Sequence, residues 1–195
     1  MALTEEFVER IERAGGRRDE ALHLPWPMPG DPASFLRFDC FAEWKGFVTQ
    51  LGLRNSLPDI IAAKFDRAHK LLLLTWLDFD LIKASELSVL STLELALMDR
   101  YADSTRKAYG LVNFAHLLRH LPEHDGLTDD KLPIYRRCRS GTVIPMLMGS
   151  RKSGLAKIRN DLAHGYPFDG FPYAGLFEFV RDLIDYAYRD FGRQA

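Results

Sequence analysis

Arg159, Asn160 and His164 are the residues of this chain whose types and spacing best suit chemistry. On a helix, Asn160 and His164 are four residues apart and are therefore neighbours on its polar side. Arg159 falls at the edge of the apolar stripe, where its aliphatic stem can pack while its guanidinium stays available. A cation, an amide and a titratable imidazole gathered on one turn suit the binding of an anion or a phosphate.

The element that must position these side chains is a short helix over residues 155–166. Its apolar residues form one narrow stripe, which predicts that a single side faces the core. The residues of that stripe are Leu155, Ile158 and Leu162. Gly165 is a natural C-terminal cap, and Pro167 prevents the helix from resuming. His164 then lies in the last turn, where the helix dipole favours a positively charged imidazole.

A second predicted helix, Leu81–Tyr101, carries an acid at a position where its pattern favours an apolar residue. Glu94 falls inside the apolar arc of this helix, and Glu86 lies on the same side nearer its start. Burying a carboxylate without a partner is unfavourable by several kcal/mol. We therefore expect Glu94, or alternatively Glu86, to pair with Arg159 across two packed helices and to fix its guanidinium.

The run Arg159-Asn160-Asp161-Leu162-Ala163-His164 resembles the Arg-Asn-x-x-x-His signature of the HEPN superfamily. This superfamily comprises small all-α domains of prokaryotic toxins, phage-defence proteins and ribonucleases. Tyr166 extends the resemblance to the Arg-x4-His-x-Tyr form of HEPN toxins that are paired with a nucleotidyltransferase antitoxin. The resemblance implies an all-α, HEPN-like helical bundle and a partner that is an antitoxin or another defence-system protein.

In HEPN ribonucleases two such helices meet across a dimer, so the resemblance also implies a homodimer that cleaves RNA. It implies His164 as general base or acid, Arg159 as phosphate clamp and Asn160 as a positioning hydrogen-bond donor. Glu94, Glu86 and Tyr166 would support the site. RNA carries its own nucleophile in the 2′-OH, so proton transfer and charge stabilisation are sufficient, and no metal or other cofactor is expected.

A different interpretation is a non-catalytic interaction module or nucleotide-binding module. In that case Arg159 only neutralises Glu94, and the turn that carries His164 braces the bundle. The position of His164 distinguishes the two interpretations. Exposure in a cleft or at a two-fold interface favours catalysis, whereas burial against a carbonyl group favours bracing.

Charge is distributed unevenly along the chain. The net charge is −1, which gives no overall electrostatic reason to bind nucleic acid. Between Lys131 and Asn160, however, there are eight basic residues and no acidic ones. A local positive field suits an RNA backbone, although a solvated loop is the other interpretation. The predicted RNA-binding residues are Arg136, Arg137, Arg139, Arg151, Lys152 and Lys157.

The histidines and cysteines of the chain give little indication of a metal site. Three histidines recur every four residues along a predicted helix, at His116, His120 and His124. No set of carboxylates or cysteines accompanies them, so a polar helix face is the preferred interpretation over a zinc site. The cysteines Cys40 and Cys138 show no metal-ligand spacing, and their number indicates a reducing cytoplasm.

The length of 195 residues suits one domain with an N-terminal extension. We expect residues 1–55 to form that extension, from short helices and a proline-rich arm over 17–32 with Trp26 packed into a groove. A helix is predicted over Phe35–Leu53, and the helical bundle over 56–195. His69 is expected to be exposed on the polar side of its helix. Because the longest apolar run is Leu71–Leu74, no membrane association is expected.

Overall fold

The computed structural model describes residues 4–15, 20–54, 56–139, 141–149, 154–165 and 171–191, and it is mainly helical. The fold is therefore all-α, as the sequence predicts. The helices are α1 (Glu5–Gly15), α2 (Phe41–Gln50), α3 (Asp59–Leu74), α4 (Leu81–Tyr109), α5 (Phe114–His124), α6 (Pro133–Cys138), α7 (Ile144–Met148), α8 (Leu155–Ala163) and α9 (Leu176–Ala187), with a 3-10 turn at Asp129–Lys131.

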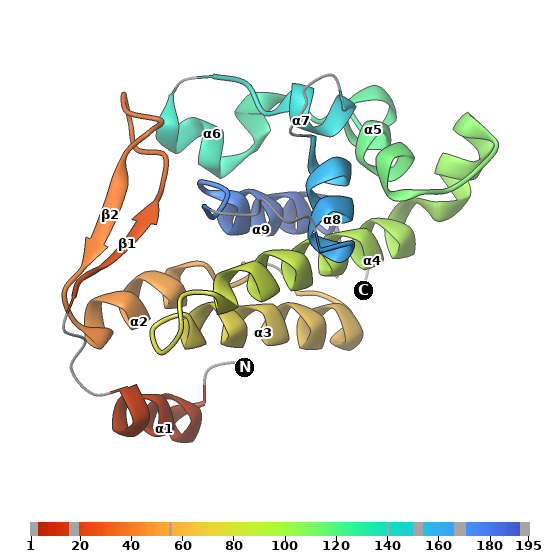
Figure 1. Cartoon of the computed structure of the whole chain (residues 1–195). Coiled ribbons are helices and arrows are strands. Elements are labelled where there is room, and N and C mark those ends of the chain that lie inside the picture. Colours follow the sequence, from red (N-terminus) through yellow and green to blue (C-terminus); the bar gives the residue numbers. More distant parts are fainter. Residues whose placement is uncertain are drawn as a thin grey trace.

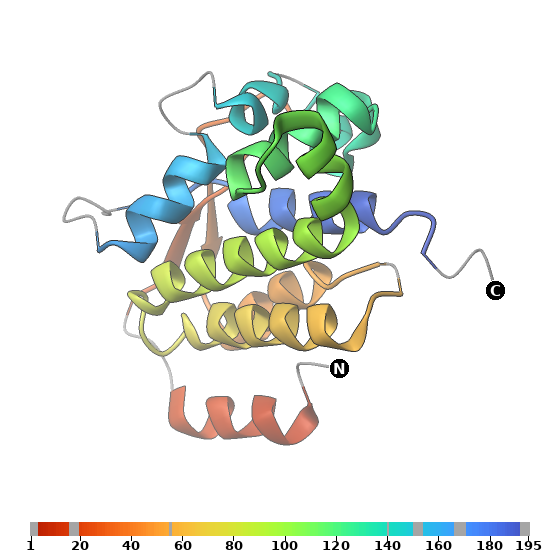
Figure 2. The ribbon, with the colours of Figure 1, turned by 90° about the vertical axis from the view of Figure 1, so that its right-hand side faces the viewer.

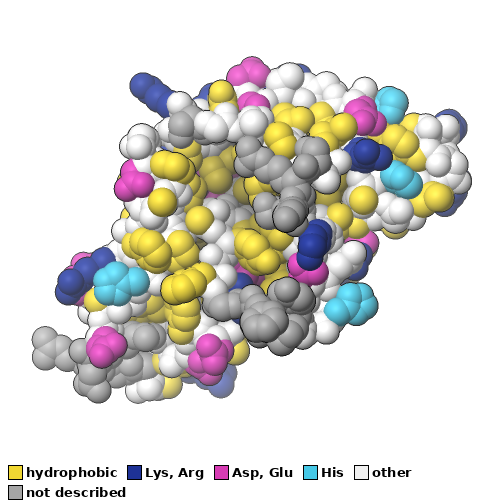
Figure 3. Space-filling model, turned by 45° about the horizontal axis from the view of Figure 1, so that its top comes forward, with side chains coloured by type: hydrophobic (Ala, Val, Ile, Leu, Met, Phe, Trp, Pro, Cys, Tyr) yellow, Lys and Arg dark blue, Asp and Glu magenta, His cyan; other side chains and the backbone are white. Residues whose placement is uncertain are grey.

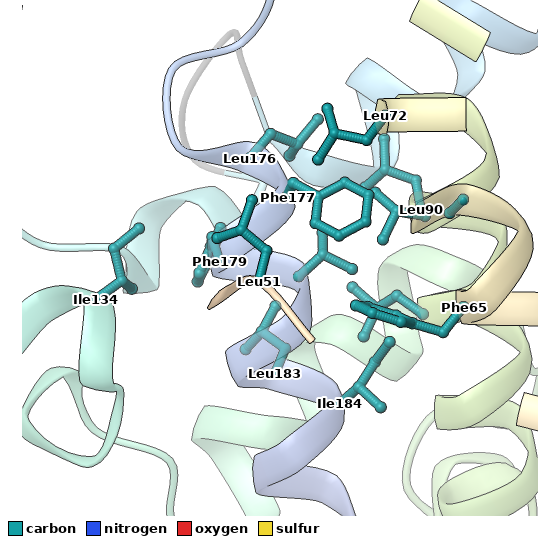
Figure 4. Packing of buried hydrophobic residues seen from close by; sticks show 14 of the residues in the cluster. Leu51, Phe65, Leu72, Leu90, Ile134, Leu176, Phe177, Phe179, Leu183 and Ile184 are labelled. Atoms are coloured by element: carbon teal, nitrogen blue, oxygen red, sulfur yellow. The ribbon is translucent and has the colours of Figure 1, made fainter. Parts of the chain in front are cut away.

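The long helix α4 is the central element of the bundle. It lies antiparallel to α3 and also packs against α5, α8 and α9 (Figures 1 and 2). Phe65 of α3, Leu90 of α4 and Phe177 of α9 meet in the core between these helices (Figure 4). The rings of Phe65 and Phe177 make an edge contact, with centroids 5.3 Å apart. Helix α8 packs against α4, α5 and α7, so its position is set by three neighbours.

The proline-rich region contains a strand pair that the sequence interpretation missed. Strand β1 (Leu22–Pro25) pairs antiparallel with β2 (Phe35–Phe38), so the helix predicted from Phe35 begins only at Phe41. Side chains of β1 alternate between buried and less buried, but four residues are too few to reveal that period in sequence. Trp26 is buried as predicted, and its ring meets that of Phe47 at a centroid distance of 4.8 Å.

The described residues of the N-terminal quarter share one hydrophobic core with the rest of the chain. Val8 and Ile11 of α1 and Trp44 of α2 belong to the same buried cluster as the residues of α3, α4 and α9. The indole Nε1 of Trp44 donates a hydrogen bond to the carbonyl of Leu73, at 3.1 Å. In the part of the chain that the structure describes, no helix combines the length and the apolar character that crossing a membrane requires.

His69 is buried, which contradicts the expectation that it is exposed. Its Nε2 lies 2.5 Å from the carbonyl oxygen of Val48, and its ring lies beside that of Phe177. The side of α3 that looks polar in sequence is covered by α2 and α9. Burial lowers the pKa of His69, against the opposing effect of the hydrogen bond to Val48.

Helix α9 carries charged side chains into the interior. Arg181 is 1% exposed and donates to the Asp182 carboxylate and to the carbonyl of Gln50. The other oxygen of Asp182 accepts the backbone N–H of Ile134, at 2.7 Å, which satisfies one free donor at the start of α6. These bonds tie α2 and α6 to α9, so the buried charges have a structural purpose.

Candidate active site

Helix α8 forms as the sequence predicts. Leu155 and Ile158 are buried on its inner side, against α4, α5 and α7. At its end, the backbone N–H of His164 donates to the carbonyl of Asn160 at 2.9 Å. Gly165 follows with φ of 66°, a left-handed conformation that favours glycine after a helix. The predicted stop at Pro167 lies outside the described residues.

The predicted pairing of Arg159 with Glu94 is confirmed. Nη2 of Arg159 donates to both carboxylate oxygens of Glu94, with Nη2 2.5 Å from Oε2. Only about a quarter of each side chain is exposed, at 25% for Arg159 and 27% for Glu94. The guanidinium also lies over the ring of Phe114, 5.6 Å from its centroid. Water is thus largely excluded from the pair, which strengthens its charge-assisted hydrogen bonds.

Arg159 also organises its neighbour on α8. Its Nη1 donates to Oδ1 of Asn160 at 2.8 Å, which orients the amide group. Nε of Arg159 is buried and has no hydrogen-bond partner among the described residues. Because a guanidinium has five N–H donors, this arrangement leaves one Nη1 N–H for a ligand.

The alternative expectation, that Glu86 pairs with Arg159, is wrong, because Glu86 bonds to other residues. It is 4% exposed, and its Oε1 accepts the backbone N–H of Tyr173 at 2.6 Å. Its Oε2 lies 3.1 Å from Nζ of Lys83, which also donates to the carbonyl of Phe171. Glu86 and Lys83 therefore anchor the segment that enters α9. An acid can be buried to hold a neighbouring segment in place, and the sequence pattern alone does not distinguish it from an active-site acid.

His164 and Asn160 are both exposed at the end of α8. Within the described part of the chain, the imidazole of His164 has no hydrogen-bond partner. His164 is therefore not buried against a carbonyl group, which is the placement that favours bracing. Tyr166, the other predicted residue of this turn, lies outside the described residues.

The described residues among those predicted to bind RNA are divided between α8 and the region of α6. Arg136 and Arg139 are exposed on and after α6, and Lys157 is exposed on α8, where it pairs with Asp161 at 2.5 Å. Arg137 pairs with Glu178 of α9 and donates to the carbonyl of Pro27. Helix α6 packs against α9, away from α8 (Figure 1). On the face shown in Figure 3, Lys and Arg side chains are dispersed. Arg151 and Lys152 lie outside the described residues.

No protein-family model, curated protein or solved structure matches this chain. The geometry of α8 and its neighbours is thus the basis for a function. That geometry combines an exposed imidazole, an oriented amide and a guanidinium fixed by a carboxylate. The set can transfer a proton and hold a negative charge.

The structure adds residues of α5 that the sequence interpretation did not connect with α8. Phe114, at the start of α5, lies beneath the Arg159 guanidinium. Two residues further along, His116 stacks on Tyr109 of α4, with centroids 4.9 Å apart and an interplanar angle of 10°. Asn113 caps the start of α5, and its side chain accepts the backbone N–H of His116. Nothing in the spacing of these residues predicts that they adjoin α8, because that contact depends on helix packing.

Proposed function

We propose that this protein is a metal-independent endoribonuclease of the HEPN type. The observation that carries the proposal is the exposed His164 beside Asn160, whose amide is oriented by an Arg159 already fixed to Glu94. The resemblance of the Arg159–His164 run to the HEPN signature supports the same function, and so does the all-α fold.

The chemistry would use the 2′-OH of the RNA as nucleophile. A base removes its proton while the 2′-oxygen attacks the adjacent phosphorus, and the bond to the 5′-oxygen breaks as that oxygen takes up a proton. The products are a 2′,3′-cyclic phosphate and a 5′-hydroxyl. His164 would serve as base or acid, and the remaining Nη1 N–H of Arg159 would bind the charged phosphate oxygens.

A single His164 is poorly suited to remove one proton and supply the other in the same step. A homodimer answers this difficulty, because the partner subunit's His164 would take the second role. The C-terminal end of α8 is exposed, which leaves it accessible to a second copy of the chain. Asn160 would orient the RNA, and Glu94 would act as a positioning residue through Arg159.

The second candidate is a non-catalytic interaction module. It is favoured by one observation, the bonding of Nη2 of Arg159 to both oxygens of Glu94. That pair alone braces α8 against α4, and it leaves the guanidinium little capacity for a substrate. In this candidate function His164 is an exposed residue with no chemical role.

Cleavage of a generic single-stranded RNA at neutral pH separates the two candidates. We expect the wild-type protein to cut RNA in the presence of EDTA, and His164→Ala to be slower by about 10²–10⁴-fold, the usual contribution of an acid–base group. Oligomeric state is measured by light scattering on the same samples. A dimeric wild-type protein that leaves RNA intact would support the interaction module.

A further inference from the structure

A hollow of about 280 Å³ lies between α5, α7 and α8, next to the candidate active site. Helix α5 contributes His116 and Arg119, α7 contributes Met146 and Met148, and α8 contributes Lys157. Among the described residues that line it, none is acidic. The hollow thus combines cationic groups from α5 and α8 with an apolar wall from α7. Lys157 already pairs with Asp161, so a phosphate ligand would have to compete with that exposed and therefore weak ion pair, and Arg119 is the main cation of the hollow.

Arg119 is the most informative residue of this hollow. It is half-buried, yet within the described chain its guanidinium has no hydrogen-bond or ion-pair partner. The other arginines near the core are occupied: Arg137 bonds to Glu178, Arg181 to Asp182 and Arg189 to Asp125. A guanidinium that gives up solvent without gaining a partner has unused capacity for an anion, and its planar fork suits phosphate.

The wall from α7 suits the apolar part of a ligand. Met146 and Met148 are partly buried, and Leu147 between them is buried. Methionine is flexible and polarisable, so it adapts to flat aromatic surfaces. A nucleotide matches both walls, because Arg119 and Lys157 suit its phosphate and the methionines suit its base.

Helix α8 connects the hollow to the candidate active site, because Lys157 lines the hollow and His164 lies at the other end of the same helix. Lys157, Asn160 and His164 are spaced i, i+3 and i+7, so they follow one stripe of the helix. At 1.5 Å per residue, Lys157 and His164 are roughly 10 Å apart along the axis. A nucleotide in the hollow would therefore lie near the phosphate at His164 without occupying the same place.

We propose that this hollow is a nucleotide-binding subsite, in which Arg119 and Lys157 bind a phosphate and the methionines of α7 bind the base. The assignment to a nucleotide of the RNA substrate rests on the proposed function. Free nucleotides and RNA chains share this chemistry, and the binding measurements distinguish them.

Binding is measured with His164→Ala protein, in which the proposed cleavage is suppressed. One arm titrates adenosine 5′-monophosphate by calorimetry, and the other titrates a fluorescent single-stranded hexaribonucleotide by anisotropy. We expect Arg119→Gln to weaken binding about tenfold and to reduce the salt dependence of RNA binding, by about 0.7 in the slope of log K against log salt concentration. Arg67→Gln is the matched control, since Arg67 is an exposed arginine of α3.

Each outcome has a distinct meaning. If Arg119→Gln weakens binding of both adenosine 5′-monophosphate and the hexaribonucleotide, the subsite accepts free nucleotides. If Arg119→Gln weakens binding of the hexaribonucleotide alone, the subsite is one for RNA. Equal effects of Arg119→Gln and Arg67→Gln, with melting temperatures near that of the parent, would overturn the subsite. If wild-type protein fails to cleave RNA while the Arg119-dependent binding persists, the ribonuclease function fails and the subsite stands. If cleavage occurs but Arg119→Gln changes neither binding nor KM, the subsite fails and the ribonuclease function stands.

Discussion

Replacing Glu94 with Gln should destabilise the fold and weaken any activity at the same time. The substitution keeps the shape of the side chain but removes the charge that faces Nη2 of Arg159. Fully exposed pairs contribute about 0–1 kcal/mol, and loss of one partner from a buried pair costs about 3–5 kcal/mol. Because both side chains are about three-quarters buried, we expect a loss of about 2 kcal/mol in the free energy of unfolding.

That loss predicts a measurable change in thermal unfolding. For a chain of 195 residues, about 2 kcal/mol lowers the melting temperature by roughly 4–8 °C. The matched control is Glu9→Gln, which breaks the exposed Glu9–Arg13 pair of α1 and should change the melting temperature by about 1–2 °C at most.

A double-mutant cycle isolates the contribution of the pair. Glu94→Gln and Arg159→Gln are measured singly and together by urea unfolding, and a coupling energy above about 1 kcal/mol is expected. If Glu94→Gln unfolds at the same temperature as wild type, the pair contributes nothing, and the view that Glu94 fixes Arg159 is refuted.

Three further perturbations test the surrounding structure. Burial raises the pKa of Asp125, but hydrogen bonds from Arg189 and Tyr101 outweigh it and hold that pKa below 3.8. Asp125 thus stabilises the fold above pH 3.8, and Asp125→Asn should lower the melting temperature at pH 7 by an amount that shrinks on acidification. Burial lowers the pKa of His69, so stability should fall as the pH drops below 6.5, and His69→Gln should reduce that fall in urea titrations. Gly165 has positive φ and open space at its Cβ position, so Gly165→Ala should cost about 1–2 kcal/mol through backbone strain alone, detected as faster amide exchange in α8.

The parts of the site that could be predicted follow from short-range rules. Helix α8 is predictable because its apolar stripe and its terminal glycine lie within one short stretch. The contact between Arg159 and Glu94 is predictable because a carboxylate on an apolar arc requires a partner. The same rule does not decide between two acids on one side of a helix, so Glu86 is an alternative partner in sequence although it bonds to Tyr173 and Lys83 in the structure.

The parts that could not be predicted depend on how helices pack. His69 lies on a side of α3 that is polar in sequence, and only the placement of α2 and α9 makes it buried. The charges of α9 are spaced along one side of that helix, yet a charged stripe ordinarily predicts exposure. The hollow around Arg119 requires α5, α7 and α8 together, and no single segment contains its pattern.

The most direct test of the central claim is the chemical identity of the RNA ends that the protein produces. Single-stranded RNA is incubated with wild-type protein or His164→Ala in EDTA, and the fragments are analysed by mass spectrometry. We predict 2′,3′-cyclic phosphate and 5′-hydroxyl ends from wild type, and intact RNA from His164→Ala over the same time. Fragments that end in 3′-hydroxyl groups, or cleavage that His164→Ala leaves unchanged, would contradict a reaction carried out by His164.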